Sequence, residues 1–200
     1  MYYGLVRIIF CAGIGRLIYC FVKKQITSRK HRKIFLIALM AIMLGFYQGT
    51  YFFPLENYIY SFSTPEEIFC YTATGKIIDV VEGKETCMII YTQQPNTYMN
   101  LFVKKEDESY KIIVPQPIPT FISILKDENM TRGSLYNFRD GTDAYLTILW
   151  STQREEVNVE DNVGSTFYHV ITQSQASNYT AVFSYAYIEN YEENYEVKIN

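Results

Sequence analysis

The sequence predicts a mainly β extracytoplasmic domain that begins with one short helix and follows one transmembrane α-helix. Three observations predict this class. Residues 34–53 form a run of twenty positions without a charge, the chain beyond them consists of short β-branched and aromatic runs separated by turn residues, and the two parts carry opposite net charge. At 200 residues the chain has room for one domain of ordinary size and an anchor.

The charge divides sharply at Phe53. The chain up to and including Phe53 contains eight Lys or Arg and no Asp or Glu, a net charge of +8. The chain after Phe53 contains ten Lys or Arg and twenty-one Asp or Glu, a net charge of −11. A basic end beside anionic lipid and an acidic domain away from it are favoured electrostatically at a membrane. The acidic charge argues against nucleic acid as a partner of the domain, and it leaves the lipid bilayer as the first expected partner.

The run from Ile34 to Phe53 has the length of a membrane span, because a helix of twenty residues is about 30 Å long. A basic cluster precedes it, made of Lys23, Lys24, Arg29, Lys30, Arg32 and Lys33. The positive-inside rule then predicts a single-pass plasma-membrane protein with a cytoplasmic N-terminus and an extracytoplasmic C-terminal domain. A cleaved signal peptide and a buried core helix are weaker alternatives, since the run is long for the first and its basic flank is unusual for the second.

Residues 5–22 are also apolar, but they contain Arg7 and Arg16, each of which costs about 2.5 to 3.5 kcal/mol at the bilayer centre. Nine residues apart, these arginines lie on opposite faces of a helix. Two interpretations stay open. The favoured one is a helix lying in the membrane interface, and the other is the first span of a hairpin whose basic loop is cytoplasmic and whose N-terminus is outside.

The expected organisation therefore has four parts. Residues 1–33 form a basic cytoplasmic or interfacial segment, residues 34–53 the transmembrane helix, residues 54–63 a juxtamembrane linker, and residues 64–200 the extracytoplasmic domain. Prolines at every second position from Pro115 to Pro119 cannot donate ladder hydrogen bonds, so a boundary between subdomains or between sheets is expected at residues 115–119.

The domain opens with a strong helix-start signal at Thr64-Pro65-Glu66-Glu67. Thr64 is the expected N-cap, Pro65 occupies the first helical position, and Glu67 closes a capping box. Gly75 is expected to end this helix within about three turns.

From Lys76 onward the apolar residues lose helical spacing and form strands. The first four predicted strands make a meander, at residues 76–82, 86–92, 97–105 and 110–114. Seven more are predicted at residues 120–126, 134–138, 144–150, 155–160, 166–172, 179–188 and 195–199. Their spacing is typical of a β-sandwich, a barrel or a rolled sheet.

Little in the sequence indicates catalysis. His169 is the only histidine after His31, so classical triads and metal sites have few side chains to use. A thiol site made of His169 with Cys70 or Cys87 is conceivable, although a histidine in TFYHVIT is more often an ordinary strand residue. No catalytic, cofactor-binding or metal-binding residues are therefore predicted.

The sequence contains a candidate disulfide and a candidate binding surface. Cys70 and Cys87 either form a disulfide, worth about 3 kcal/mol outside the cell, or remain two buried thiols. Phe183, Tyr185 and Tyr187 share one face of a strand and can form an aromatic platform for a sugar or a peptide, unless they are simply the aromatic residues that sheets favour. The acidic segments Asp140–Asp143 and Glu160–Asn162 are interpreted as turns rather than calcium loops.

The run TPEEIFCYTATGKIIDVVEGKETCMIIYT, followed by a strand pair ending in YKI, resembles uncharacterised small single-pass envelope proteins of Gram-positive bacteria. The resemblance covers about a quarter of the chain, from Thr64 to Ile112, and implies a short helix and a meander displayed outside a plasma membrane. It implies no functional residues.

The sequence thus leaves three hypotheses for function. The leading one is a non-enzymatic binding or accessory module of the cell envelope, with a protein or polysaccharide partner. The second is an envelope enzyme with a Cys/His site, and the third is a signalling or immunity subunit that acts through its membrane anchor.

Overall fold

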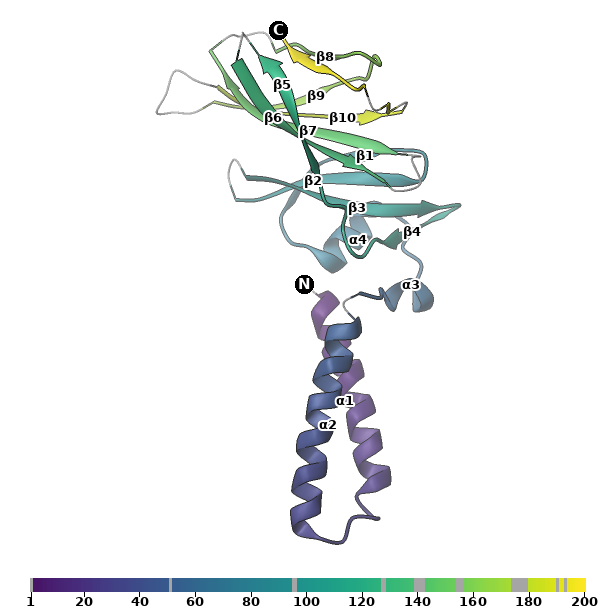
Figure 1. The fold of residues 1–200 in the computed structure, drawn as a ribbon. Helices are drawn as coiled ribbons and strands as arrows, with labels where there is room; N and C mark the ends of the chain where they lie inside the picture. The colour runs from purple at the N-terminus through teal and green to yellow at the C-terminus, as the bar shows by residue number, and fades with distance from the viewer. Residues whose placement is uncertain are drawn as a thin grey trace.

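The structure is a computed structural model that describes residues 2–50, 52–94, 97–126, 129–138, 143–153, 157–173, 180–189, 191–192 and 194–200. Two long helices form a hairpin, and two β-sheets lie beyond the open end of that hairpin (Figure 1). We call residues 56–200, which hold two short helices and both sheets, the β region. Among the described residues, β structure therefore dominates, as the sequence predicts.

Helix α1 (Tyr2–Val22) runs antiparallel to helix α2 (Arg29–Thr50) and packs along it (Figure 1). This packing forms the helical hairpin of the second interpretation of residues 5–22. The placement of α1 relative to a membrane, in the interface or across the bilayer, stays a prediction. The sequence predicted one apolar helix of membrane-spanning length, and the described residues contain two.

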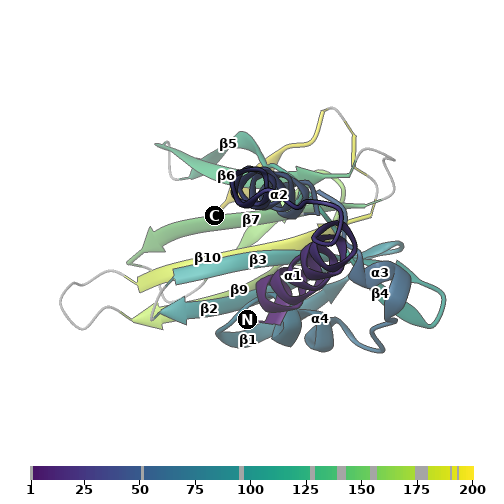
Figure 2. The ribbon, with the colours of Figure 1, turned by 90° about the horizontal axis from the view of Figure 1, so that it is seen from below.

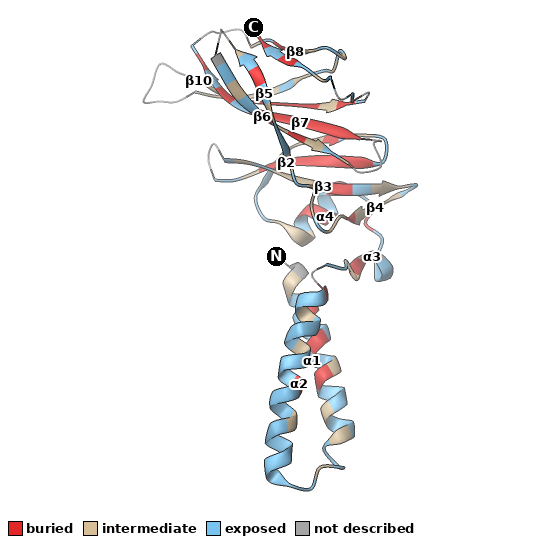
Figure 3. Cartoon of the chain, viewed as in Figure 1, coloured by how far each residue is buried: buried red, intermediate tan, exposed pale blue. Residues whose placement is uncertain are grey.

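Both helices are long and apolar enough to cross a membrane, over Gly4–Val22 and Arg29–Thr50. This statement rests on length and composition alone, and a signal sequence near an N-terminus has the same properties. A core helix of a globular protein is mostly buried, whereas only 17% and 11% of the residues in the two apolar windows are buried. Most residues of the hairpin are exposed (Figure 3), and many of the exposed ones are large and apolar.

The seam of the hairpin uses two small residues and one arginine on α1. Arg7, Cys11 and Gly15 follow one another at four-residue spacing and are buried against α2. A Cβ atom on Gly15 would lie 3.2 Å from Cγ of Met43, so the Met43 side chain would have to shift to admit a larger residue there. Close approach at small residues is typical of helices that pack in membranes.

Two short helices connect the hairpin to the sheets. Helix α3 (Glu56–Ile59) lies within the predicted linker. Helix α4 (Pro65–Thr72) confirms the predicted start, because the Glu67 amide donates to Thr64 Oγ1 at 3.3 Å and Pro65 is the first helical residue. The Glu67 carboxylate accepts from the Ser63 amide at 2.8 Å, one residue before the position expected for a capping box.

Gly75 separates α4 from the first strand. Its φ of +140° is a backbone conformation that L side chains rarely adopt, and a Cβ atom there would lie 2.4 Å from the Thr92 carbonyl oxygen. The close approach lets the chain enter the sheet directly beside the second strand.

The first sheet is the predicted meander. Its strands are β1 (Lys76–Glu82), β2 (Thr86–Gln94), β3 (Thr97–Glu106) and β4 (Ser109–Ile112), antiparallel in the order β1-β2-β3-β4. The chain leaves this sheet through the proline segment, where Gln116 takes the place of a strand partner. Its side chain accepts from the Phe102 amide at 2.8 Å and donates to the Phe102 carbonyl at 3.0 Å.

The second sheet has the order β8-β11-β5-β6-β7-β10-β9. Its long strands are β5 (Thr120–Lys126), β6 (Asn129–Asn137), β7 (Ala144–Thr152), β9 (Tyr168–Gln173) and β10 (Thr180–Ile188), and its short ones are β8 (Val159–Asp161) and β11 (Val197–Ile199). Strand β11 pairs with β5 in parallel, and the other pairings are antiparallel. The C-terminal strand β11 joins β8 to β5, and the sheet curves over its own core (Figure 1).

Three apolar clusters hold the β region together. The first lies between α4 and the first sheet and includes Ile68, Cys87 and Ile89. The second lies between the two sheets, where Met88 and Ile90 meet residues of β7 and β10. The third fills the rolled second sheet. Because both faces of β2 are covered, six consecutive residues from Thr86 to Tyr91 are buried (Figure 3).

Candidate functional site

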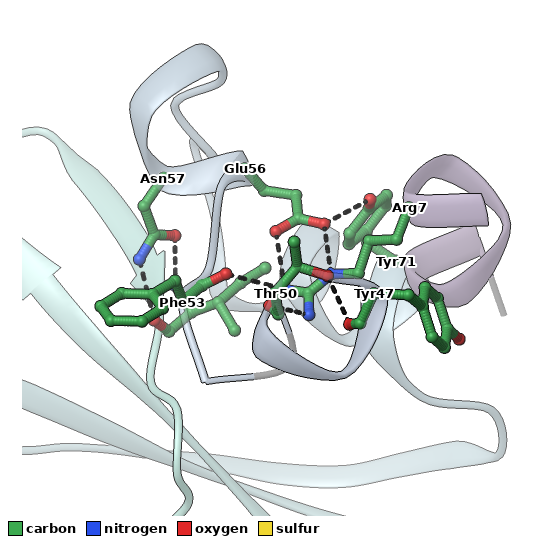
Figure 4. A network of polar contacts seen from close by, with 8 residues as sticks. Arg7, Tyr47, Thr50, Phe53, Glu56, Asn57 and Tyr71 are labelled. Atoms are coloured by element: carbon green, nitrogen blue, oxygen red, sulfur yellow. Dashed lines mark hydrogen bonds and ion pairs between the residues drawn. The ribbon is translucent and has the colours of Figure 1, made fainter. Parts of the chain in front are cut away.

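The junction between the helical hairpin and the β region is built around Arg7 (Figure 4). Its side chain extends from α1 and is only 1% exposed. The guanidinium donates to both Glu56 carboxylate oxygens, at 3.3 and 3.2 Å, to the Phe53 carbonyl at 3.3 Å and to the Thr50 carbonyl. Arg7 therefore joins the first helix to the end of the second and to α3.

This arrangement satisfies groups that a helix end leaves open. The last carbonyls of α2 have no partner within the helix, and a cation beside them is favoured both by hydrogen bonding and by the helix dipole. The Tyr71 hydroxyl donates to Glu56 at 3.2 Å, which brings α4 into the same network. Removing one partner of a buried ion pair costs about 3 to 5 kcal/mol, since it leaves the other charge uncompensated.

A side-chain amide extends the network to the first sheet. Asn57 accepts from the Ile112 amide and donates to the Ile112 carbonyl, both at 2.9 Å, and so pairs with β4 as another strand would (Figure 4). Three steps thus connect α1 to the sheet, through Arg7, Glu56 and Asn57. The hairpin is joined to the β region by specific polar contacts rather than by an unstructured linker.

Beside the Arg7 network lies a cavity of about 560 Å³, which we call the junction cleft. Its walls come from α1, from the segment around α3, and from α4. The lining residues are Val6, Arg7, Phe10, Leu55, Glu56, Ile59, Tyr60, Phe62, Glu67, Cys70 and Tyr71. Most of these side chains are apolar or aromatic, so the cleft suits an apolar ligand.

Apolar side chains also project outward beside the cleft. Ile59 and Tyr58 are more than 80% exposed, and Phe52 and Phe53 at the end of α2 are about two-thirds exposed, at 68% and 65%. Exposed aromatic and aliphatic groups at the end of an apolar hairpin are typical of the membrane–water interface.

The opposite end of the hairpin is basic. The six residues of the predicted cluster lie in the turn between the helices and at the start of α2, away from the β region (Figure 1). Arg16 lines a groove of about 690 Å³ between α1 and α2, in the half of α1 nearer to this turn. The hairpin therefore has one basic end and one end attached to an acidic β region.

Cys70 and Cys87 do not form the candidate disulfide, because both thiols are free. Helix α4 does cover the face of β2 that carries Cys87, but Cys70 points to the junction cleft on the other side of that helix. Burial, followed by the charge of Glu82, raises the pKa of the Cys87 thiol to about 12. A thiol with such a pKa is inert at neutral pH.

His169 lies in the second sheet, away from both cysteines. Its Nδ1 atom is 2.9 Å from the Ser184 hydroxyl, which also accepts from the Trp150 indole at 2.9 Å. Burial lowers the pKa of the imidazole, so it is neutral at pH 7. Ser184 pairs with His169 on neighbouring strands, whereas Cys87 belongs to the cluster under α4. The conceivable Cys/His site is thus not assembled.

The aromatic platform is also not formed. Phe183 and Tyr185 are only 6% and 4% exposed, and with the partly buried Tyr187 they lie in the layer between the sheets. Phe183 stacks on Tyr98 with 4.7 Å between ring centroids. The two tyrosine hydroxyls donate to Asp79 at 2.8 Å and to Asp143 at 2.9 Å. These rings build the core, as the alternative interpretation holds.

Asp143 is the polar residue that sequence reasoning missed most clearly. Its carboxylate is buried and accepts from the amides of Lys84, Glu85 and Thr86, at 2.7 to 2.9 Å, and from the hydroxyls of Thr86 and Tyr187. Burial alone would raise the pKa of this carboxyl, but the hydrogen bonds outweigh burial and lower it. The carboxylate fastens the β1–β2 turn to the second sheet. Residues 140–142, the rest of the expected acidic loop, lie outside the described residues.

The other acidic segment is a turn only in part, because Glu160 and Asp161 end strand β8 and Asn162 begins the turn after it. Asp161 accepts from the Ser165 amide at 2.8 Å and from the Tyr195 hydroxyl at 3.0 Å. Within the described ranges there is no group of three or more His, Cys, Asp or Glu that could hold a metal ion.

A second, polar cleft of about 460 Å³ opens between β1 and the edge of the second sheet. Asp79, Glu82 and Glu189 line it together with Tyr168 and Tyr187. Two of its carboxylates are already paired, because Glu82 accepts from Lys105 at 2.9 Å and Glu189 lies 3.3 Å from Lys84. This cleft therefore offers less negative charge than its lining residues suggest.

Comparison with known proteins gives no relative on which to base a function: no family model, no curated protein and no solved structure matches this chain. The resemblance of residues 64–112 to envelope proteins of Gram-positive bacteria stays a prediction. The junction, with its buried ion pair and its apolar cleft, is the candidate functional site on structural grounds alone.

Proposed function

We propose that this protein is a two-pass membrane protein whose helical hairpin holds the β region against the outer surface of the plasma membrane, where it acts as a non-enzymatic binding or accessory module of the cell envelope. The observation that carries the proposal is the polarity of the hairpin. One end is a basic turn, and the other is joined to an acidic β region through Arg7 and Glu56.

Helix length supports two spans rather than one. With 21 and 22 residues, α1 and α2 are each about 32 Å long, which is close to the hydrocarbon thickness of a bilayer. The positive-inside rule puts the basic turn in the cytoplasm, so the β region and the N-terminus are both extracytoplasmic. This orientation keeps the predicted location of the β region and reverses that of the N-terminus.

The arginines that made a span difficult to accept from sequence lie near the two ends of α1. Arg7 is five residues after Tyr2, about 8 Å from the outer end, and its charge is compensated by Glu56. Arg16 is six residues before Val22, about 9 Å from the inner end, and its long side chain can extend to the interface. Neither guanidinium has to remain at the bilayer centre.

The non-enzymatic role is supported by the positions of the reactive side chains. Cys87 is buried with a raised pKa, Cys70 opens into an apolar cleft, and His169 is hydrogen-bonded within the other sheet. We propose an envelope protein or polysaccharide as the partner, in keeping with an acidic β region outside the cell. No nucleic acid and no cofactor is part of the proposal.

Complementation of a deletion strain tests the role. A full-length variant with Cys70→Ala, Cys87→Ala and His169→Ala is expected to restore the wild-type phenotype, because none of these side chains does chemistry. Far-ultraviolet circular dichroism of the purified variant verifies that it is folded. Failure of the folded variant, with rescue by wild-type protein at equal abundance, would reject the non-enzymatic role.

A further inference from the structure

The junction cleft shares a wall with the outward face of α1. Val6 and Phe10 line the cleft, and both side chains are also partly exposed, at 47% and 45%. They lie four and eight residues after Tyr2, which is about 6 to 12 Å along the helix from its outer end. If α1 spans the bilayer, this wall of the cleft reaches the depth of the hydrocarbon.

The remaining walls belong to the β region rather than to the hairpin. Ile59 and Tyr60 come from α3 and the residue after it, and Cys70 and Tyr71 come from α4. The cleft therefore places apolar side chains of α3 and α4 beside apolar side chains of α1. If α1 spans the bilayer, an apolar molecule can extend from the lipid along α1 onto the β region.

The polar atoms at the cleft do not select a charged ligand. The Arg7 guanidinium is held by Glu56 and by two carbonyls of the chain, and the Glu67 carboxylate accepts from the Ser63 amide at 2.8 Å. A phosphate or carboxylate ligand would have to break the buried Arg7–Glu56 pair, which costs free energy. An uncharged acyl chain leaves this pair intact. The cavity volume of about 560 Å³ lies in the ordinary range for small-molecule sites.

We propose that the junction cleft binds one acyl chain of an outer-leaflet phospholipid, drawn up beside α1 and covered by Ile59, Tyr60 and Cys70. This proposal rests on the proposed membrane hairpin, which supplies the lipid. The bound chain covers apolar surface on α3 and α4 and holds the β region close to the membrane.

Photocrosslinking tests the proposal with the full-length protein. The protein is reconstituted into vesicles of phosphatidylcholine and phosphatidylglycerol that contain a phospholipid with a diazirine in its acyl chain, and labelled residues are mapped by mass spectrometry after irradiation. Label is expected on α1 and α2, which contact the bilayer, and also on Cys70 and Tyr71 in α4.

Two variants distinguish the cleft from the surface around it. Cys70→Trp places an indole in the cleft and is expected to abolish labelling of Tyr71. Glu66→Trp is the matched control, because Glu66 is an exposed residue of the same helix that does not line the cleft, and it is expected to leave labelling of Tyr71 unchanged. Both variants should show the circular dichroism spectrum of the wild type.

The outcomes separate this proposal from the proposed membrane hairpin. Label confined to α1 and α2, with none on α4, would overturn the acyl-chain site and leave the hairpin in the membrane. Equal labelling of Tyr71 in the wild type and in Cys70→Trp would also overturn the site. Absence of label from both long helices would contradict the membrane hairpin itself.

Discussion

Removing the Asp143 carboxylate should be among the most destabilising single changes in the β region. Asp143 is 1% exposed, and its oxygens accept five hydrogen bonds from two other parts of the fold. In Asp143→Ala the Thr86 amide stays buried without an acceptor, which costs about 1 to 3 kcal/mol, and the charge-assisted bonds to the other donors are also lost. We expect the free energy of unfolding to fall by about 3 to 5 kcal/mol.

The neighbourhood of Asp143 cannot easily close around the gap. Gly83 approaches so closely that a Cβ atom on it would lie 2.8 Å from Asp143 Oδ1 and 2.4 Å from the Tyr145 hydroxyl. The turn is therefore built around the carboxylate, and water entering the gap would restore only some of the bonds. A loss of about 3 to 5 kcal/mol is a large fraction of the stability of a typical domain.

Fluorescence of Trp150 provides the assay. It is the only tryptophan of the chain, and it is buried in the second sheet, so its emission reports on unfolding of that sheet. Urea titrations of the full-length protein in detergent micelles compare wild type, Asp143→Ala and the control Glu108→Ala, which removes an exposed carboxylate from a turn. The control should change stability by less than about 0.5 kcal/mol. A loss of under 1 kcal/mol in Asp143→Ala would refute the inference that this carboxylate fastens the β1–β2 turn to the second sheet.

Three further predictions use the same assay. The folded protein holds the pKa of Asp143 and Asp161 below their usual value. The stability that these two carboxylates contribute is therefore complete above the unfolded pKa of about 3.9 and is lost as the pH falls through the lowered folded pKa. Wild type should lose stability below about pH 4, and Asp143→Asn should lose less over the same pH range. Arg7→Ala should cost about 3 to 5 kcal/mol, and adding Glu56→Gln should restore part of this, whereas strictly additive losses would contradict a coupled pair. Tyr185→Phe removes the hydroxyl that donates to Asp79 and should cost about 1 kcal/mol, and an unchanged urea midpoint would show that the bond does not stabilise the fold.

Local signals predicted the elements of the β region well. The capped start at Thr64, the four-stranded meander and the change of sheet at the prolines are all present, because each depends on neighbouring residues. Strands β1 and β5 have the predicted bounds. Strand β11 is shorter than predicted, since its pairing depends on where the chain end returns to the sheet, and residues 155 and 156 of the predicted β8 lie outside the described residues.

The predictions that failed concern which side of an element faces which neighbour. Helix α4 covers the Cys87 face of β2, as a disulfide would require, yet Cys70 lies on the outer side of the helix. Alternation along strand β10 predicted that its aromatic side chains share one face. The sequence does not show that the first sheet covers this face. Both outcomes depend on packing between segments far apart in the chain.

The sequence contains one signal that predicts the contact between Arg7 and Glu56. Arg7 is a base within the first apolar run, and Glu56 is the first acid after the second run. An arginine in an apolar helix needs a partner, and in an antiparallel hairpin the start of the first helix meets the end of the second. That reasoning requires the hairpin, which the sequence left as one of two alternatives.

Cysteine accessibility in intact protoplasts tests the two-pass arrangement most directly. In a background with Cys20→Ser and Cys70→Ser, single cysteines are placed before Met1, at Ser28→Cys in the basic turn and at Glu108→Cys in the β region, and a membrane-impermeant maleimide is added. The proposed arrangement predicts labelling of the first and third positions, and labelling of the turn only after permeabilisation. A labelled turn in intact protoplasts, or an N-terminal cysteine that stays protected while Glu108→Cys reacts, would contradict it.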